Sequence, residues 1–234
     1  MRAFFAVKGV NSAMRWGMVI DLTKCIRCYS CIAACRVEHF LPMGINWPRL
    51  AAVETCEQNG PRVSTYSIRC NHCQDPPCVK VCPTQASQQR ADGIVWVDQN
   101  KCVGCRYCAI VCPYQNRMFL SKDKDQGWFP GKGRTEIEKA GKRIYPHQVG
   151  TTEKCNFCME RIDAGLKKGL KPGIDRDATP ACVNMCPGRT LVFGDLDDPN
   201  SAVSKLIAEK RAFQLHPEYE TNPSIYYIDG KIGA

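Results

Sequence analysis

Sixteen of the seventeen cysteines in this chain of 234 residues fall into four tight quartets. The first and third quartets share the spacing C-x2-C-x2-C-x3-C: Cys25, Cys28, Cys31 and Cys35, then Cys102, Cys105, Cys108 and Cys112. The second quartet has the spacing C-x2-C-x4-C-x3-C: Cys70, Cys73, Cys78 and Cys82. The fourth is split into two pairs: Cys155 and Cys158, then Cys182 and Cys186. Thiols so close together in sequence favour metal ligation over a framework of loop-closing disulfides.

The spacing within the quartets indicates which metal chemistry is involved. A cubane [4Fe-4S] cluster takes thiolates that converge from several directions, and C-x2-C-x2-C wraps one loop around one face of it. In two-cluster ferredoxins, a cysteine before proline ligates the other cluster; Pro83, Pro113 and Pro187 follow three of the quartets. Zinc sites use C-x2-C pairs a dozen or more residues apart, and only the fourth quartet resembles them. The sequence therefore predicts four [4Fe-4S] clusters.

The other potential ligands show no such pattern. Cys56, in Glu54-Thr55-Cys56-Glu57, is interpreted as an ordinary small side chain rather than a redox thiol. The four histidines lack ligand spacing and are interpreted as surface or hydrogen-bonded side chains: His39, His72, His147 and His216. All quartets keep four cysteines, so no position predicts a three-iron centre or a histidine ligand.

A basic residue stands directly before the first cysteine of every quartet: Lys24, Arg69, Lys101 and Lys154. Beside a negatively charged cluster, such a cation would favour the reduced state and raise the reduction potential. The alternative is a solvated side chain at the mouth of the loop, where screening makes the effect small. The sequence leaves both interpretations open.

The formal net charge of +9 would by itself suggest an anionic partner. Four oxidised clusters with their thiolates contribute about −8, so the loaded protein would be nearly neutral. Basic residues form only short runs such as Lys142-Arg143, with no stripe of interleaved aromatic residues. Binding to nucleic acid is therefore not expected.

Short segments of β-type sequence precede three quartets, and helical turns follow the ligand loops. Strands are expected at 18–22, 64–68 and 93–97, and helical turns at 32–37 and 109–112. Because two quartets make one ferredoxin-type domain, the fold class is predicted to be α+β with two bacterial-type 2×[4Fe-4S] ferredoxin-like domains, irregular loops and a C-terminal tail. Bound metal would supply much of the folding free energy, so the apo chain is expected to be largely unfolded.

Two segments lie outside the quartets. Residues 121–147 form a polar insert, which its glycines suggest is a loop and a candidate partner contact: Gly131, Gly133 and Gly141. Residues 200–213 have apolar positions that suit an amphipathic helix, and 225–228 are strand-like.

No apolar run approaches the length of about 18 residues that a spanning helix needs. The first 18 residues contain a short apolar patch, Ala3 to Val7, but no signal-length hydrophobic region and no twin arginine. The chain is therefore expected to carry no signal or transmembrane segment of its own. Its compartment would be the cytoplasm, the membrane surface, or the periplasm after export with a signal-bearing partner.

The residues around the cysteines resemble a known family from about Trp16 to Ile228: the four-cluster iron-sulfur (beta) subunits of the dimethyl sulfoxide reductase family of molybdopterin oxidoreductases. Polysulfide reductase, formate dehydrogenase and phenylacetyl-CoA:acceptor oxidoreductase have subunits of this kind. The resemblance rests on these motifs: Asp21 to Cys25, Asn71-His72-Cys73, Pro76-Pro77-Cys78, Asp98 to Cys105, Lys154 to Cys158, Pro180-Ala181-Cys182 and Phe193 to Leu196. The chain departs from the commonest pattern in its insert and in lacking proline after Cys35.

The resemblance implies that quartets one and four share an outer domain and that quartets two and three share an inner domain inserted in it. The implied domain bounds are 16–60 and 151–198 for the outer domain, 61–150 for the inner domain and 199–234 for a C-terminal helix and tail. The implied ligand sets are Cys25, Cys28, Cys31 with Cys186; Cys155, Cys158, Cys182 with Cys35; Cys70, Cys73, Cys78 with Cys112; and Cys102, Cys105, Cys108 with Cys82.

The resemblance also implies the partners. A catalytic subunit would hold molybdenum or tungsten on a bis-molybdopterin cofactor, and in many members a membrane anchor exchanges electrons with quinone. This chain would relay single electrons without binding substrate, and no catalytic motif in it suggests an enzyme in its own right. The alternative is a free polyferredoxin without a fixed catalytic partner.

Overall fold

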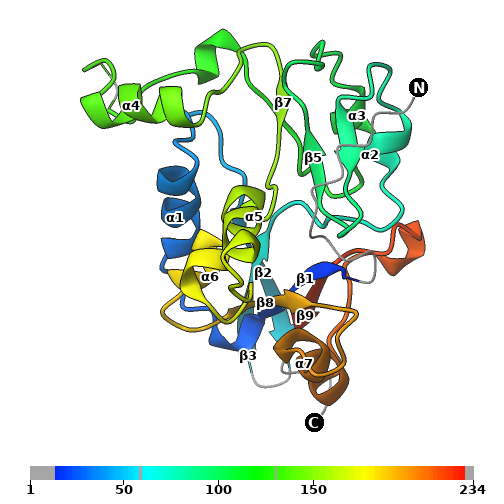
Figure 1. Ribbon diagram of the computed structural model, residues 1–234. Coiled ribbons are helices and arrows are strands. Elements are labelled where there is room, and N and C mark those ends of the chain that lie inside the picture. Colours follow the sequence, from blue (N-terminus) through cyan, green and yellow to red (C-terminus); the bar gives the residue numbers. More distant parts are fainter. Residues whose placement is uncertain (1–13, 58–59, 130, 230–234) are drawn as a thin grey trace.

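The computed structural model describes residues 14–57, 60–129 and 131–229, so the apolar patch at Ala3 to Val7 lies outside the described residues. The strands are β1 (Trp16–Asp21), β2 (Arg49–Glu57), β3 (Gly60–Ile68), β4 (Ser87–Gln89), β5 (Val95–Val97), β6 (Met118–Phe119), β7 (Thr152–Glu153), β8 (Leu191–Asp195) and β9 (Ile225–Ile228). The α-helices are α1 (Ser30–Glu38), α2 (Pro77–Lys80), α3 (Tyr107–Ile110), α4 (Glu136–Ile144), α5 (Met159–Lys167), α6 (Ala181–Asn184) and α7 (Ala202–Lys210). Short 3-10 turns are η1 (Leu22–Lys24), η2 (Lys122–Lys124), η3 (Arg176–Ala178) and η4 (Pro217–Tyr219). The architecture is α+β with small sheets (Figure 1).

Strand β1 is the centre of a three-stranded sheet in the order β8-β1-β9, antiparallel to β8 and parallel to β9. Alternate side chains of a strand point to opposite faces, and here both faces are buried. Met18 and Ile20 join the main apolar core, whereas Val19 packs with Val203 of α7 and Ile228. The strand predicted at 225–228 and the helix predicted within 200–213 are therefore both present: β9 is an edge strand of this sheet, and α7 packs on one of its faces.

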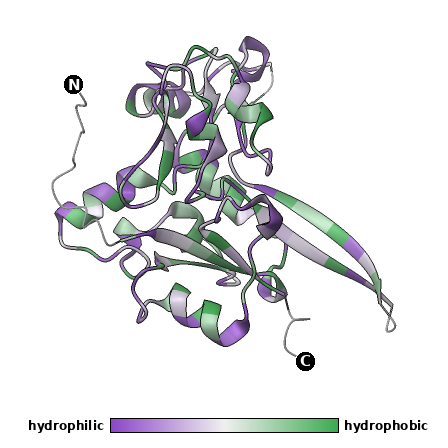
Figure 2. Cartoon of the chain, turned by 90° about the vertical axis from the view of Figure 1, so that its right-hand side faces the viewer, coloured by the Kyte–Doolittle hydropathy of each residue, from purple (hydrophilic) through white to green (hydrophobic). Residues whose placement is uncertain are grey.

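The strand predicted at 64–68 is the inner end of a longer ribbon. Strands β2 and β3 pair antiparallel over nine residues each and extend away from the body of the molecule (Figure 2). At the base of the ribbon Thr65 and Ser67 are buried, whereas Val53 and Val63 further out are exposed. Cys56 is exposed opposite Pro61 near the far end.

The residues between the second and third quartets form a compact hairpin. Strand β5 lies within the predicted segment 93–97 and pairs antiparallel with β4. Helices α2 and α3, which carry cysteines of these two quartets, contact each other beside the hairpin. Strands β6 and β7 then bring the end of the third quartet next to the start of the fourth.

The insert at 121–147 is not only a loop, and that expectation is wrong in part. Gly131 and Gly133 have left-handed backbone, as loop glycines do, but Gly141 lies inside helix α4 and is buried against Phe40. A capping box starts this helix, because the Thr135 hydroxyl accepts from the Glu138 N–H while the Glu138 carboxylate accepts from Thr135. The polar composition of this segment concealed a helix that has an N-terminal capping box and a glycine at its contact with Phe40.

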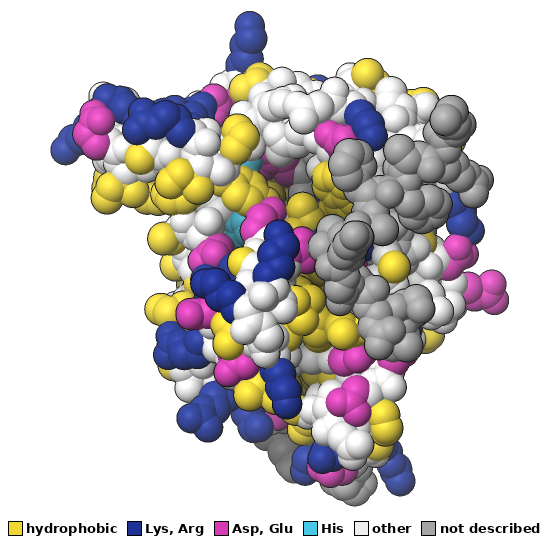
Figure 3. All heavy atoms as spheres, viewed as in Figure 1, with side chains coloured by type: hydrophobic (Ala, Val, Ile, Leu, Met, Phe, Trp, Pro, Cys, Tyr) yellow, Lys and Arg dark blue, Asp and Glu magenta, His cyan; other side chains and the backbone are white. Residues whose placement is uncertain are grey.

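Helix α4 leaves part of its surface open. Ile137 and Ile144 are exposed on it, and Figure 3 shows hydrophobic and basic side chains side by side on this projecting part of the molecule. Within the described residues, no helix combines the length and the apolar sequence needed to cross a membrane.

Candidate metal centres

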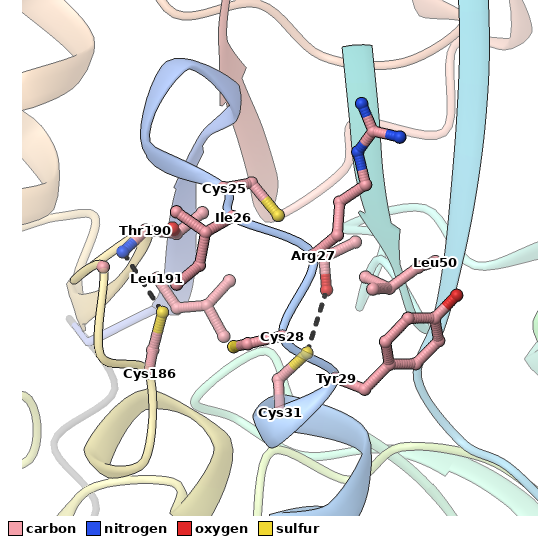
Figure 4. A pocket seen from close by; sticks show the side chains of 12 residues that line it. Cys25, Ile26, Arg27, Cys28, Tyr29, Cys31, Leu50, Cys186, Thr190 and Leu191 are labelled. Carbon is pink, nitrogen blue, oxygen red and sulfur yellow. Dashed lines mark hydrogen bonds between the residues drawn. The ribbon is translucent and has the colours of Figure 1, made fainter. Parts of the chain in front are cut away.

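Four cysteines line an open hollow of about 350 Å³ whose wall also includes Leu50 of β2, Ser67 of β3 and Leu191 of β8. Cys25, Cys28 and Cys31 come from the loop between η1 and α1, and Cys186 comes from the turn after α6. Figure 4 shows their sulfur atoms turned toward the space between these two segments. Two polar groups approach the sulfurs: the Thr190 N–H donates to Cys186 Sγ at 3.3 Å, and the Ser67 hydroxyl lies 3.7 Å from Cys31 Sγ. We call this group the Cys25 set.

A second open hollow, of about 310 Å³, is also lined by four cysteines. Cys102, Cys105 and Cys108 come from the loop before and within α3, and Cys82 comes from the turn after α2. The Ser87 N–H donates to Cys82 Sγ at 3.4 Å. We call this group the Cys102 set.

The third group is fully buried. Burial raises the pKa of the Cys35 thiol well above its ordinary value, and its neighbours Cys155, Cys158 and Cys182 raise it further. Burial also raises the pKa of Cys155 to about 11, although the nearby charge of Arg69 opposes the change. We call these four cysteines the Cys155 set.

The fourth group is partly buried: Cys73 and Cys78 are buried, and Cys70 and Cys112 are half-buried. Burial raises the pKa of Cys73 to about 12, with Cys70 the largest neighbouring influence and Cys78 and Cys112 contributing less. We call these four residues the Cys70 set. Every one of the four sets therefore takes three cysteines from one quartet and one from another.

A common backbone feature shapes the four ligand loops. The second residue after the first cysteine of each quartet has left-handed backbone: Arg27, His72, Gly104 and Phe157. A non-glycine residue rarely adopts this conformation, so three such residues at equivalent positions mark a constrained turn. At Gly104 a side chain is excluded, because a Cβ would lie 2.1 Å from the Gly150 carbonyl oxygen. The turn reverses the chain between the first two cysteines of each loop.

The donor sets fit a metal cluster better than they fit free thiols. In the Cys155 and Cys70 sets, burial disfavours the thiolate form, so these thiols alone would remain protonated at neutral pH. A coordinating metal removes the thiol proton outright. Among the described residues, no three His, Cys, Asp or Glu side chains form a site for a single metal ion.

The four basic residues before the quartets lie in two different environments. Arg69 and Lys154 are buried, whereas the side chains of Lys24 and Lys101 are 56% exposed and pair with Asp21 and Asp98. Arg69 Nη1 donates to Cys182 Sγ at 3.0 Å, so it reaches the Cys155 set rather than its own quartet. The interpretation as a solvated side chain at the mouth of the loop therefore fits Lys24 and Lys101, and it does not fit Arg69 and Lys154.

Lys154 lies between two sets. Its ammonium donates to the Val95 carbonyl oxygen and, at 2.7 Å, to the Cys155 carbonyl oxygen. Its positive charge opposes the rise in the pKa of both Cys155 and Cys78. Lys154 thus places a cation where the Cys155 set and the Cys70 set approach each other.

Sequence reasoning missed Arg117. This residue is 7% exposed, and its Nη2 donates to Cys78 Sγ at 2.9 Å. It stands five residues after Cys112, outside the pattern of a basic residue before a quartet. No signal in the sequence distinguishes it from the other arginines, because its contact with Cys78 is made by the fold.

Three of the four histidines are buried. His39 Nε2 lies 3.3 Å from Cys158 Sγ, and burial lowers the pKa of His39 to about 3, so the ring is neutral. His147 bridges the Glu153 carboxylate and the His39 carbonyl oxygen, both at 2.7 Å. His72 stacks on Phe157 and accepts the Val95 N–H. The prediction of hydrogen-bonded side chains holds for these residues, but the contact of His39 with a cysteine was not foreseen.

These loops and cysteine sets define the class of protein as an iron-sulfur protein of the ferredoxin type. The family model that matches the chain, over residues 62–128, is described as a 4Fe-4S dicluster domain. A Halobacterium salinarum protein assigned as an iron-sulfur subunit of dimethyl sulfoxide reductase is 39% identical over 93% of this chain and 80% of its own length. The Archaeoglobus fulgidus Hdr-like menaquinol oxidoreductase iron-sulfur subunit 1 is 35% identical over 96% of this chain and 86% of its own length. The arsenate respiratory reductase iron-sulfur subunit ArrB of a Shewanella species is 37% identical over 92% of this chain and 96% of its own length.

Identity at this level over nearly the whole chain establishes the relationship. The chain belongs to the family of iron-sulfur (beta) subunits of dimethyl sulfoxide reductase-type oxidoreductases.

Proposed function

We propose that the protein is an electron-transfer subunit that holds four [4Fe-4S] clusters, one on each of the Cys25, Cys155, Cys70 and Cys102 sets. The observation that carries this proposal is the grouping of sixteen cysteines into four sets of four. When bound, such a cluster accepts and releases one electron at a time. The subunit names of the relatives support the same role.

The protein contributes an environment for charge rather than a substrate site. Buried N–H donors and cations approach the cysteine sulfurs, and such groups stabilise the additional negative charge of a reduced centre. Of the four sets, only the Cys25 and Cys102 sets include exposed cysteines, Cys28 and Cys105. We infer that electrons enter and leave at these two sets and pass through the Cys155 and Cys70 sets, which have no exposed cysteine.

We also propose that the domains are nested, with an inner unit at 61–150 and an outer unit at 16–60 and 151–198. Two observations support this division. First, the Cys70 and Cys102 sets use only cysteines from residues 70–112. Second, β1, which precedes the inner segment in the sequence, pairs with β8, which follows it. Because β9 also pairs with β1, residues 225–228 belong with the outer unit rather than with a separate tail.

The partner we propose is a catalytic subunit with a molybdenum or tungsten pterin cofactor, joined in some assemblies by a membrane anchor. Named relatives from dimethyl sulfoxide and arsenate reductases support the catalytic partner. A relative named for a menaquinol oxidoreductase supports exchange of electrons with a quinol-linked component. The chain itself would bind no substrate.

Elemental analysis tests the cluster assignment directly. Anaerobically purified full-length protein should contain about sixteen iron and sixteen acid-labile sulfide per chain, four of each for every set. Serine variants of Cys28 and of Cys56 form a matched pair, because both cysteines are exposed but only Cys28 belongs to a set. Cys28→Ser should lose or alter one cluster and Cys56→Ser none. Zinc without sulfide in the wild-type protein would contradict the proposal.

A further inference from the structure

Arg69 connects two cysteine sets of the outer unit. Its side chain is 1% exposed; Nη1 donates to Cys182 Sγ of the Cys155 set at 3.0 Å, and Nη2 donates to the Ser67 hydroxyl. The same hydroxyl lies 3.7 Å from Cys31 Sγ of the Cys25 set. One guanidinium and one hydroxyl therefore form a continuous polar link between the two sets.

Arg117 makes the corresponding link in the inner unit. Its Nη2 donates to Cys78 Sγ of the Cys70 set at 2.9 Å and to the Ser87 hydroxyl at 2.5 Å. The backbone N–H of Ser87 in turn donates to Cys82 Sγ of the Cys102 set at 3.4 Å. The two units thus repeat one arrangement: an arginine on the third cysteine of a quartet, and a serine that reaches the neighbouring set.

In the part of the chain that the structure describes, neither arginine has a carboxylate as counter-charge: the charged partners of both guanidinium groups are thiols. Arg69 Nε and Arg117 Nη1 are buried and have no hydrogen-bond partner among the described residues. A buried guanidinium with free donors is costly unless an anion lies beside it. Both charges also interact with a thiol of the second set, Arg69 with Cys31 and Arg117 with Cys108. Each arginine therefore lies where a negatively charged group on either of two cysteine sets would balance its charge.

We propose that Arg69 and Arg117 are each shared between the two clusters of one unit and raise the reduction potentials of both. This inference rests on the proposed function, since it requires a cluster on each set. Reduction of a [4Fe-4S] core from the 2+ to the 1+ state adds one electron and no proton, so the negative charge of the site increases by one. A fixed cation between two such sites stabilises either reduced state and weakens their mutual repulsion.

Redox titration of the anaerobic full-length holoprotein with dithionite, followed by electron paramagnetic resonance, tests the proposal. Arg69→Met and Arg117→Met remove the charge and keep an unbranched apolar stem. In each variant the directly bonded cluster should be about tenfold harder to reduce, which is a shift of about 59 mV to lower potential for a one-electron couple. The second cluster of the same unit should shift in the same direction by less, and the other unit should not change.

Matched controls are provided by the exposed lysines that directly precede Cys25 and Cys102. Lys24→Met and Lys101→Met also remove one positive charge, but solvent already screens these side chains. Their titrations should overlay the wild-type curve. Arg69→Lys should recover part of the shift, and Ser67→Ala should lower the potential of the Cys25 cluster while Cys182 keeps its partner.

The outcomes separate the inference from the proposed function. Fewer than four clusters in the wild-type protein would contradict the proposed function. A full iron content in Arg69→Met and Arg117→Met with unchanged potentials, or equal shifts in the lysine controls, would overturn the shared role of the arginines alone. If a Met variant fails to keep its clusters, the Ser67→Ala titration decides, and an unchanged potential of the Cys25 cluster would reject the proposal.

Discussion

The basic residues near the cysteines show which side-chain environments a sequence pattern can predict and which it cannot. The basic residue before each quartet is a regular feature of the sequence, yet only Arg69 and Lys154 are buried. In the other two cases an aspartate three residues earlier, Asp21 or Asp98, pairs with the lysine and keeps it at the surface. That distinction could have been read from the sequence. The role of Arg117 could not, because its contact with Cys78 joins residues 39 positions apart.

The crossed ligands give a prediction at the same scale. If Cys112 completes the Cys70 set, Cys112→Ser should alter the cluster on Cys70, Cys73 and Cys78, either by conversion to a three-iron form or by a shift in potential. The cluster on Cys102, Cys105 and Cys108 should stay intact, since its fourth ligand would be Cys82. Electron paramagnetic resonance of the anaerobic protein distinguishes the two centres.

Cys82→Ser is the reciprocal variant, and it should affect the Cys102 set first. Loss of the cluster on Cys102, Cys105 and Cys108 in Cys112→Ser would refute the crossed arrangement. The count of four clusters would be unaffected by that result.

Among the helices and strands, those next to cysteines were predicted well and those in the insert poorly. The strands expected at 18–22, 64–68 and 93–97 all exist within one or two residues of their bounds or as the end of a longer strand. Alternating apolar residues and nearby turns specify such strands locally. Helix α4 has few apolar residues and three glycines in or near it, so its sequence resembles a loop. Its position depends on tertiary contacts: Gly141 packs against Phe40, Glu138 accepts the Trp128 N–H, and Lys142 pairs with Asp125.

The contact between Gly141 and Phe40 can be tested. A Cβ at position 141 would lie 2.0 Å from Phe40 Cδ1, so Gly141→Ala should displace the helix even though alanine is the better helix former. Overpacking of this kind costs about 1–3 kcal/mol. Hydrogen exchange of residues 136–144 should become faster. Lys139→Ala, an exposed position on the same helix, should leave the exchange unchanged, and unchanged exchange in Gly141→Ala would show that Phe40 moves aside freely.

At the scale of the whole molecule, one small sheet joins distant parts of the chain that we assign to the outer unit. Strand β1 has neighbours from the far end of the chain on both sides, β8 at 191–195 and β9 at 225–228. The hydrophobic pattern predicted β1 and β9, but it predicted neither β8 nor the pairing of the three strands. Pairing across such separations depends on the cysteine loops that β1 and β8 must bring together. The family resemblance, rather than periodicity, supplied the nested arrangement of the two units.

The sheet predicts an uneven response to damage at β9. Ile225 is fully buried, and Ile225→Ala should destabilise the protein by about 2–5 kcal/mol. Because β9 pairs with β1, which we assign to the outer unit, the clusters on the Cys25 and Cys155 sets should be released first on warming, as followed by their paramagnetic signals. Glu209→Ala on the exposed side of α7 serves as the control. Simultaneous loss of all four signals would show that the two units unfold as one.

The nesting of the units also has a consequence for biosynthesis. All eight cysteines of the Cys70 and Cys102 sets have been made once the ribosome passes residue 112, whereas the Cys155 set lacks Cys182 and the Cys25 set lacks Cys186 until some seventy residues later. The central sheet closes later still, when residue 228 emerges and β9 can pair with β1. With the nested units that we propose, iron and sulfide would be inserted in two stages: the inner unit would mature on the nascent chain, and the outer unit only after Cys186 has been synthesised.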